Sequence, residues 1–228
     1  RLMDQLNKKN INCPRPLKDK NKKYVTLIKR KSACIVTFLN GKDKKFLNNK
    51  NCYDAGKNIG KLHKASNKMQ LYRKNSMSIN NLDLLLKSIK FKTKTIAPNL
   101  ESILSTNLKI IKKEWPKNLP KGIIHGDLFI DNIFYKKNKF AGFIDFYFSC
   151  NDFLMYEIAI CINALCFDKK NNKFTLNKIK VKNLIKGYQS IRKISQKEKK
   201  ALNVLCRGAA LRYLSTRIYD YFNTPKTA

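Results

Sequence analysis

Acidic residues, histidine and arginine are all scarce in this sequence. Its 228 residues include 15 Asp and Glu and two His against 49 Lys and Arg, which gives a formal net charge of +34. Arginine occupies eight positions, so lysine supplies 49 − 8 = 41 cations, spread along the whole chain. A dedicated nucleic-acid site clusters its cations and relies on arginine. We therefore interpret the charge as a compositional bias on solvated faces, with binding to RNA or a membrane surface as the alternative.

The patterns typical of metal sites, disulfides and membrane spans are also missing. Two histidines without a CxxC pair fit no common zinc spacing. The seven cysteines are odd in number and irregularly spaced, which favours free thiols in a reducing compartment, with Cys150, Cys161, Cys166 and Cys206 buried. The longest near-apolar run, 153–167, is shorter than a membrane span. We expect a cytoplasmic protein with no signal peptide and no membrane segment.

Hydrophobic periodicity predicts a small strand-bearing part followed by a mostly helical body, an α+β arrangement. Residues 1–10 predict the end of a helix, so we expect further sequence upstream, and 22–31 with 32–41 predict a β-hairpin. A second, tight hairpin is predicted at 133–145. Ser195 and Glu198 form a capping-box pattern at the start of a long helix. The other helices are predicted at 49–66, 80–90, 100–115, 153–167 and 178–193.

The stretch IIHGDLFIDNIFY, residues 123–135, carries the clearest chemical pattern. Asn132 lies five residues after Asp127 and just before a predicted strand, and Asp145 ends the second arm of that hairpin. Because a hairpin returns its far end to its start, Asp145 should lie beside Asn132, and an amide oxygen with a carboxylate suits Mg²⁺. Asp127 on the adjacent loop can orient a hydroxyl group and accept its proton. Phosphoryl transfer from Mg-ATP to an alcohol needs this division of roles.

The other polar residues of this pattern favour structural roles. His125 follows an apolar run, which predicts a hydrogen-bonded core residue that supports the loop. We also interpret His63 as a structural residue, and Asp131 as a solvent-exposed or helix-capping residue. A serine or cysteine triad has no local support in the sequence. The prediction therefore depends on the combined spacing of Asp127, Asn132 and Asp145, which is more specific than His-Gly-Asp alone.

The segment HGDLFIDN resembles the catalytic loop of the aminoglycoside phosphotransferase and choline kinase superfamily, which is related to the protein kinases. The longer stretch IIHGDLFIDNIF…GFIDFYFSCNDFLMYEIAICINALCF is similar to the bacterial homoserine kinases of the phosphotransferase type, as are RGAALRYLSTRIYDYFNTP, NCPRPL and IVTFLNG. The resemblance implies a protein-kinase-like fold, with residues 1–40 as the remnant of a strand-bearing N-lobe and 41–228 as a helical C-lobe. It also implies ATP-dependent phosphorylation of the L-homoserine hydroxyl, a step toward threonine.

Carried over position by position, the resemblance implies that Asp127 is the catalytic aspartate and that Asn132 and Asp145 are the Mg²⁺ ligands. Asp4 falls where the acidic partner of an ATP-gripping basic residue is expected, with a solvated surface aspartate as the alternative. The inter-lobe segment whose backbone is implied to bind adenine consists of Val36, Thr37, Phe38 and Leu39. The implied small molecules are thus ATP, Mg²⁺ and L-homoserine.

Homoserine is a small zwitterion, so its carboxylate favours an arginine and its ammonium group a carboxylate. Arg207 and Arg212 are candidates for the first contact, and Asp152 for the second. Structural roles are the alternatives: either arginine can pin the long helix to neighbouring carbonyls. Asp152 can likewise cap the helix that is predicted from Phe153.

Two departures from the resembled family bear on activity. The strands that carry the phosphate-covering loop and the ATP-gripping residue would precede Arg1, so we expect this chain alone to phosphorylate poorly. Glu157 stands where the relatives usually have Asp. Three alternatives remain open: a kinase for another amino alcohol or an aminoglycoside, a basic nucleic-acid-binding protein on a kinase-like fold, and a degenerate pseudo-kinase. No sequence pattern indicates the oligomeric state.

Overall fold

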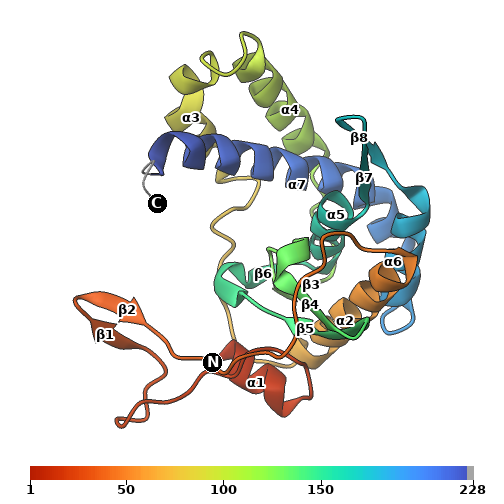
Figure 1. Cartoon of the computed structure of the whole chain (residues 1–228). Helices are drawn as coiled ribbons and strands as arrows, with labels where there is room; N and C mark the ends of the chain where they lie inside the picture. Colours follow the sequence, from red (N-terminus) through yellow and green to blue (C-terminus); the bar gives the residue numbers. More distant parts are fainter. Residues whose placement is uncertain (225–228) are drawn as a thin grey trace.

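Helix α7 (Gln196–Asn223) crosses the molecule and has helices packed on two sides (Figure 1). The computed structural model describes residues 1–224, so the last four residues of the predicted C-lobe lie outside it. Helices α3 and α4 pack on one side of α7, and α5 on another, with the α2–α6 pair beyond α5. The remaining helices are α1 (Leu2–Lys8), α2 (Asn49–Ser66), α3 (Leu82–Thr93), α4 (Leu100–Glu114), α5 (Leu154–Leu165) and α6 (Lys178–Gln189).

The strands form four two-stranded antiparallel sheets within the described residues. The pairs are β1 (Thr26–Ile28) with β2 (Lys31–Ala33), β3 (Lys121–Ile124) with β6 (Cys150–Phe153), β4 (Ile133–Lys136) with β5 (Lys139–Phe143), and β7 (Phe167–Lys170) with β8 (Lys173–Leu176). The predicted hairpin at 133–145 is confirmed. The pairing of β3 with β6 and the β7–β8 hairpin were not predicted, because their short strands carry no long alternating pattern.

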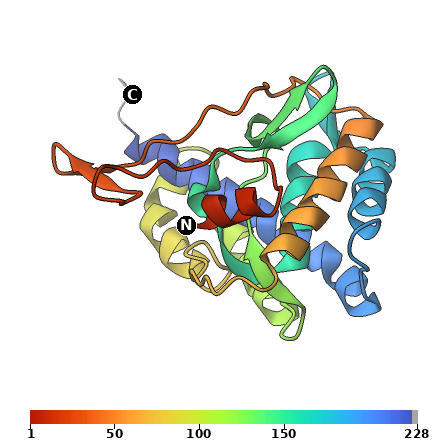
Figure 2. The ribbon, with the colours of Figure 1, turned by 90° about the horizontal axis from the view of Figure 1, so that it is seen from below.

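Three hairpins turn through two residues that both have positive φ angles. These pairs are Lys29–Arg30, Lys137–Asn138 and Asn171–Asn172. Two successive positive φ angles are typical of the type I′ turn, whose twist matches that of paired strands. The first hairpin has only three residues in each strand, so the prediction of strands over 22–31 and 32–41 was wrong in length. Its strands are largely exposed, and it projects away from the helices (Figure 2).

The predicted helices are present, but α6 ends at Gln189, four residues before the predicted end, and α3 runs from Leu82 to Thr93 instead of 80–90. Ser195 and Glu198 form the predicted capping box at the start of α7, with each side chain accepting a hydrogen bond from the other residue's backbone N–H. Asn48 and Asn51 form a second capping box at the start of α2. The apolar helix predicted at 153–167 begins one residue later and ends at Leu165, because the chain then enters β7. Local capping chemistry therefore sets the starts of α7 and α2.

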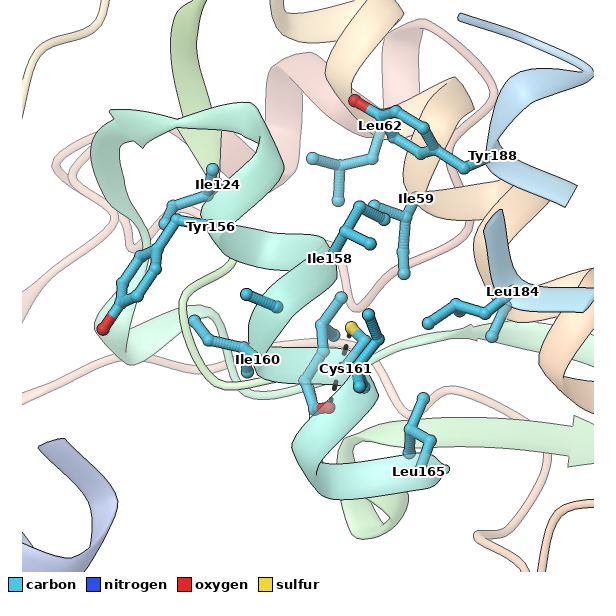
Figure 3. Close-up of a cluster of buried hydrophobic side chains, with 14 of the residues drawn as sticks. Ile59, Leu62, Ile124, Tyr156, Ile158, Ile160, Cys161, Leu165, Leu184 and Tyr188 are labelled. Carbon is cyan, nitrogen blue, oxygen red and sulfur yellow. Dashed lines mark hydrogen bonds between the residues drawn. The ribbon is translucent and has the colours of Figure 1, made fainter. Parts of the chain in front are cut away.

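The main core lies where α2, α5 and α6 meet the strands (Figure 3). Ile59 of α2, Ile158 of α5 and Leu184 of α6 are fully buried there. All seven cysteines are free thiols; of the four expected to be buried, three are, and Cys206 is half-buried. A second core joins α3, α4 and α7. No helix among residues 1–224 combines the length and the hydropathy needed to cross a membrane.

Two glycines allow α2 and α6 to approach backbone to backbone. A Cβ atom on Gly56 would lie 2.0 Å from the carbonyl oxygen of Leu184, and one on Gly187 would lie 2.0 Å from that of Tyr53. No side chain fits at either position without moving a helix. The contact bears on the site because α2 also packs against β3, the strand that leads into the loop that carries Asp127.

Candidate active site

The loop after β3 has a backbone conformation that requires glycine. Gly126 has a φ angle of +81°, and a Cβ atom there would lie 2.8 Å from the carbonyl oxygen of Phe148. Both the positive φ angle and the lack of space exclude other side chains. The glycine therefore brings the chain close to the segment after β5, and Asp127 follows directly.

Buried Glu157 on α5 holds this loop from behind. Its carboxylate accepts hydrogen bonds from the backbone N–H groups of His125 and Gly126, the latter at 3.1 Å. Nε2 of His63 lies 3.9 Å from the same carboxylate, and Nδ1 of His63 is 2.8 Å from the hydroxyl of Tyr188. Residues of α2, α5 and α6 thus form one buried polar chain that ends on the loop. The sequence analysis noted Glu157 only as a departure from its relatives.

His125 contacts structural groups rather than the open side of the loop. Its Nε2 atom is 2.8 Å from the carbonyl oxygen of Ile144, and its ring lies against Phe146 with 4.6 Å between ring centroids. Complete burial lowers the pKa of His125, so the ring stays neutral and donates its Nε2–H to that carbonyl. These contacts join the loop to the end of the β4–β5 hairpin.

The carboxylate of Asp127 is half-buried and held by two neighbouring side chains. The hydroxyl of Tyr213 lies 3.3 Å from one oxygen and also 3.3 Å from the carbonyl of Gly126, and Nδ2 of Asn132 lies 3.4 Å from the other oxygen. Burial raises the pKa of Asp127, while the nearby positive charge of Arg212 acts in the opposite direction. Asp127 lines a cavity of about 760 Å³ between α7 and the start of α3. A carboxylate in this position is accessible to a small molecule in the cavity.

Asn132 and Asp145 are brought together by the β4–β5 hairpin. Ile133 pairs with Phe143, and the backbone N–H of Ile144 donates to the carbonyl of Asn132 at 3.1 Å. Asp145 follows directly and has a positive φ angle of 57°, which is uncommon for an aspartate and costs conformational energy. The backbone register thus places Asn132 and Asp145 next to each other at the open end of the hairpin, as predicted.

The two side chains supply a fitting donor set for a hard cation. Nδ2 of Asn132 donates to the carbonyl of Asp127 at 2.7 Å, so its amide oxygen faces away from that carbonyl. The exposed carboxylate of Asp145 accepts a hydrogen bond from the N–H of Tyr147 at 3.2 Å. An amide oxygen and a carboxylate suit Mg²⁺. Within residues 1–224 no group of three His, Cys, Asp or Glu side chains could hold a metal, so further ligands would come from bound phosphate or water.

Of the three residues expected to contact the substrate, only Arg212 lines the Asp127 cavity. It is almost fully buried and donates to the carbonyl of Gly126 at 2.8 Å. Arg207 lies near α4, with Glu114 and Asn107 each 3.5 Å away. It therefore contacts a different face of α7 from the one that borders the cavity.

Asp152 is also outside that cavity. It accepts hydrogen bonds from Nδ2 of Asn75 at 2.6 Å and from the backbone N–H of Phe153 at 2.7 Å. The second contact joins Asp152 to the residue before α5, which is the capping alternative considered from the sequence. Asp152 and Arg207 therefore both lie outside the cavity that Asp127 lines.

The residues predicted to contact the nucleotide lie in the N-terminal segment, before α2. Asp4, in the first turn of α1, pairs with Lys8 at 3.2 Å, and this hydrogen bond lowers the pKa of Asp4. The N–H of Thr37 donates to the carbonyl of Arg15 at 2.9 Å, next to an isolated antiparallel bridge between Pro16 and Val36. Phe38 in that segment is 86% exposed. Its ring is thus available for contact with a planar ligand.

Five residues of α7 that the sequence did not single out also border the cavity: Tyr213, Thr216, Arg217, Tyr219 and Asp220. Of these, Tyr213, Arg217 and Asp220 are four and then three residues apart, so they share one face of the helix. A sequence signal was present in this spacing of polar residues. It was not decisive, because helical periodicity alone does not identify the face that borders a cavity.

Comparison with known proteins agrees with this geometry. Residues 1–173 match the model of the phosphotransferase enzyme family. The chain is 38% identical to homoserine kinase from Bartonella henselae over 224 residues, covering 98% of this chain and 69% of that protein. It is 36% identical to homoserine kinase from Rhizobium meliloti over 227 residues, covering 100% of this chain and 69% of that protein. These identities are high enough to establish the family.

Solved structures show the same fold at low sequence identity. Amicoumacin kinase hAmiN, in complex with AMP-PNP, Ca²⁺ and Ami, superposes with a TM-score of 0.73 at 14% identity, covering 100% of this chain and 70% of that one. A microcompartment-associated aminopropanol kinase gives 0.67 at 12% identity, covering 96% and 75%. The predicted α+β, aminoglycoside-phosphotransferase-like fold is confirmed. The chain belongs to the phosphotransferase enzyme family, among its homoserine kinases.

Proposed function

We propose that this protein transfers the γ-phosphoryl group of ATP to the side-chain hydroxyl of L-homoserine, a step toward threonine in the cytoplasm. The names of its relatives, at 36–38% identity, support the acceptor. The observation that carries the chemistry is the position of Asp127, whose carboxylate lines a cavity large enough for a small alcohol. Phosphoryl transfer needs such a carboxylate to orient the acceptor hydroxyl.

Asp127 is assigned as the residue that receives the hydroxyl proton. Burial raises the pKa of its carboxyl group, which makes the ionised form a better proton acceptor than an exposed aspartate. The contacts from Tyr213 and Asn132 fix the orientation of the two oxygens. One oxygen can then accept a hydrogen bond from the substrate hydroxyl as the phosphorus–oxygen bond forms.

Asn132 and Asp145 are assigned as the ligands of Mg²⁺. When bound, the ion neutralises charge on the phosphate oxygens. The hairpin fixes the two ligands on neighbouring positions, and the hydrogen bond from Asn132 to the Asp127 carbonyl couples the metal ligand to the catalytic loop. We assign the backbone of Val36 to Leu39 to the adenine ring. Asp4 is the proposed acidic partner of an ATP-gripping basic residue.

His125, Arg212 and Glu157 are assigned to positioning. Each acts on the loop rather than on a substrate: His125 bonds the Ile144 carbonyl, Arg212 bonds the Gly126 carbonyl, and Glu157 accepts from the loop N–H groups. A loop held from three directions keeps the carboxylate of Asp127 in one orientation. This preorganisation lowers the entropic cost of reaching the reactive geometry.

The test compares Asp127→Asn with Asp131→Asn in the full-length gene product. Asp131 lies on the same loop but is exposed, so its variant controls for the loss of a charge there. ADP release is measured with L-homoserine, choline, ethanolamine and an aminoglycoside as acceptors. We expect a preference for L-homoserine, loss of turnover by about a hundredfold or more in Asp127→Asn, and nearly unchanged turnover in Asp131→Asn. A preference for any other acceptor, or activity in Asp127→Asn equal to wild type, contradicts the proposal.

A further inference from the structure

The charged residues that line the cavity beside Asp127 differ from those of the rest of this chain. Its charged lining residues are Asp127, Arg212, Arg217 and Asp220. Lysine makes up 41 of the 49 basic residues, yet no lysine among the described residues lines this cavity. The cavity therefore departs from the basic character of the rest of the chain, with two positive and two negative side chains. A site of this kind discriminates by the arrangement of charges rather than by net charge.

Two of these four side chains are already engaged in the catalytic loop. Asp127 faces the reacting hydroxyl, and Arg212 is buried against the carbonyl of Gly126. Arg217 and Asp220 are both exposed. Within residues 1–224 neither side chain forms a hydrogen bond or an ion pair, with the other or with a third residue. Both charges are thus free to bind a ligand in the cavity.

The spacing of Arg217 and Asp220 matches the two charges of an amino acid. Residues three apart on a helix have Cβ atoms about 5–6 Å apart. The ammonium and carboxylate groups of an amino acid share one carbon atom, so they need opposite charges at such a separation. The guanidinium fork of arginine suits a carboxylate, and the aspartate suits an ammonium group.

These two residues also lie in line with the catalytic aspartate. Around the helix, Arg217 and Asp220 are about 40° and 20° from Tyr213, whose hydroxyl contacts Asp127. Side chains on a helix lean toward its N-terminus, which turns both groups back toward Asp127. Leu82 and Leu85 also line the cavity. They provide an apolar surface for the two methylene groups between the hydroxyl and the α-carbon.

We propose that Arg217 and Asp220 bind the α-carboxylate and the α-ammonium group of the acceptor and so select an amino acid over a simple amino alcohol. The inference rests on the proposed homoserine kinase activity and names the residues that determine its specificity. It replaces Arg207 and Asp152, which lie outside the cavity, as the partners of the zwitterion.

The experiment uses three acceptors with Arg217→Gln and Asp220→Asn in the full-length gene product. 3-Amino-1-propanol lacks the carboxylate of homoserine, and 4-hydroxybutyrate lacks its ammonium group. Arg217→Gln should raise KM for L-homoserine and 4-hydroxybutyrate by on the order of tenfold or more, with little change for 3-amino-1-propanol. Asp220→Asn should raise KM for L-homoserine and 3-amino-1-propanol, with little change for 4-hydroxybutyrate. Lys199→Gln, at an exposed position of α7 outside the cavity, is the control.

Each outcome has a distinct meaning. If wild type phosphorylates L-homoserine but both variants keep its KM, the specificity assignment is wrong and the proposed function stands. An increase of KM in Arg207→Gln that exceeds the increase in Arg217→Gln would likewise overturn the assignment. If wild type does not phosphorylate L-homoserine, the proposed function fails, and the specificity assignment fails with it. Matched losses for all three acceptors would indicate general damage to the site and also contradict the proposal.

Discussion

The reactivity of Asp127 depends on a balance between burial and its contacts. Burial raises the pKa of the carboxyl group, whereas the charge of Arg212 and the hydrogen bond from Tyr213 lower it. Burial is the largest of these effects. A base with a raised pKa accepts a proton more readily, but it becomes protonated at a higher pH than an exposed aspartate. The side chains around it therefore set the acid limit of activity.

This balance predicts the pH dependence of turnover. The proposed role requires the ionised form of Asp127, whose fraction falls as the pH drops through the raised pKa. We expect kcat/KM for L-homoserine to decline with a midpoint above the ordinary pKa of aspartate. Tyr213→Phe removes a hydrogen bond that lowers this pKa, so the midpoint should move to higher pH. A rate profile measured from acid to neutral pH tests both statements, and an unchanged midpoint in Tyr213→Phe would contradict them.

At the scale of elements, α5 supports the catalytic loop through one side chain. Glu157 accepts hydrogen bonds from two successive backbone N–H groups, and no water reaches them because all the partners are buried. A neutral side chain of similar size cannot satisfy both donors as well, since one of its two terminal groups is itself a donor. The stability of the loop thus depends on a charge inside the core.

Glu157→Gln should lower the free energy of unfolding by about 1–3 kcal/mol, because a buried N–H group loses its charged acceptor. Urea denaturation measures this change. Glu114→Gln is the matched control: Glu114 is exposed at the end of α4 and should change stability by only about 0.5 kcal/mol. The Gln variant should also lower kcat for L-homoserine more than it changes KM, since the loop orients a catalytic group. Equal stability of the Glu157→Gln and Glu114→Gln variants would show that Glu157 does not stabilise the loop.

The close backbone contact between α2 and α6 leads to a second prediction at the scale of elements. Glycine to alanine in a helix interior usually increases stability by about 0.5–1 kcal/mol. At Gly56 the sign should reverse, because the added methyl group would lie 2.0 Å from the Leu184 carbonyl oxygen and would force the helices apart. Gly56→Ala should therefore destabilise by about 1–3 kcal/mol. Lys61→Ala, at an exposed position of the same helix, should have almost no effect. Chemical denaturation of both variants measures whether the free energy of unfolding falls or rises.

At the scale of the whole molecule, the dominant feature is a net charge of +34 on 228 residues. Only 15 acidic residues are available, and six ion pairs of Lys or Arg with Asp or Glu are formed within the described chain. Most lysines therefore repel one another across the surface. This repulsion acts against the compact state and is weakened by salt.

Added NaCl should consequently raise the Tm. For a chain of this size, each kcal/mol of repulsion removed corresponds to about 2–4 °C. Thermal denaturation in a series from low salt to physiological salt measures the shift. Sucrose at matched osmolality serves as the control, because it does not screen charge. A Tm that is independent of NaCl would show that the lysines are spaced too widely to affect folding.

The sequence by itself determined the features that depend on neighbouring residues. Helical periodicity and the Ser195 cap placed most helices, and the hairpin between Asn132 and Asp145 placed these two residues side by side. Such features follow from local backbone geometry, which a short stretch of sequence carries within itself. The short exposed strands were less predictable, since they bury no face that would leave an alternating pattern.

Only the tertiary structure decided which charged residues of α7 border the cavity. Arg207 lies about 120° around the helix from Tyr213, whereas Asp220 lies about 20° from it. The sequence fixes these angles, but the face that meets α3 and the catalytic loop depends on packing between distant segments. For the same reason the contact of Glu157 with His125, 32 residues away in sequence, was not foreseen. Local patterns specify the elements and the proposed catalytic aspartate, and packing selects the residues that surround them.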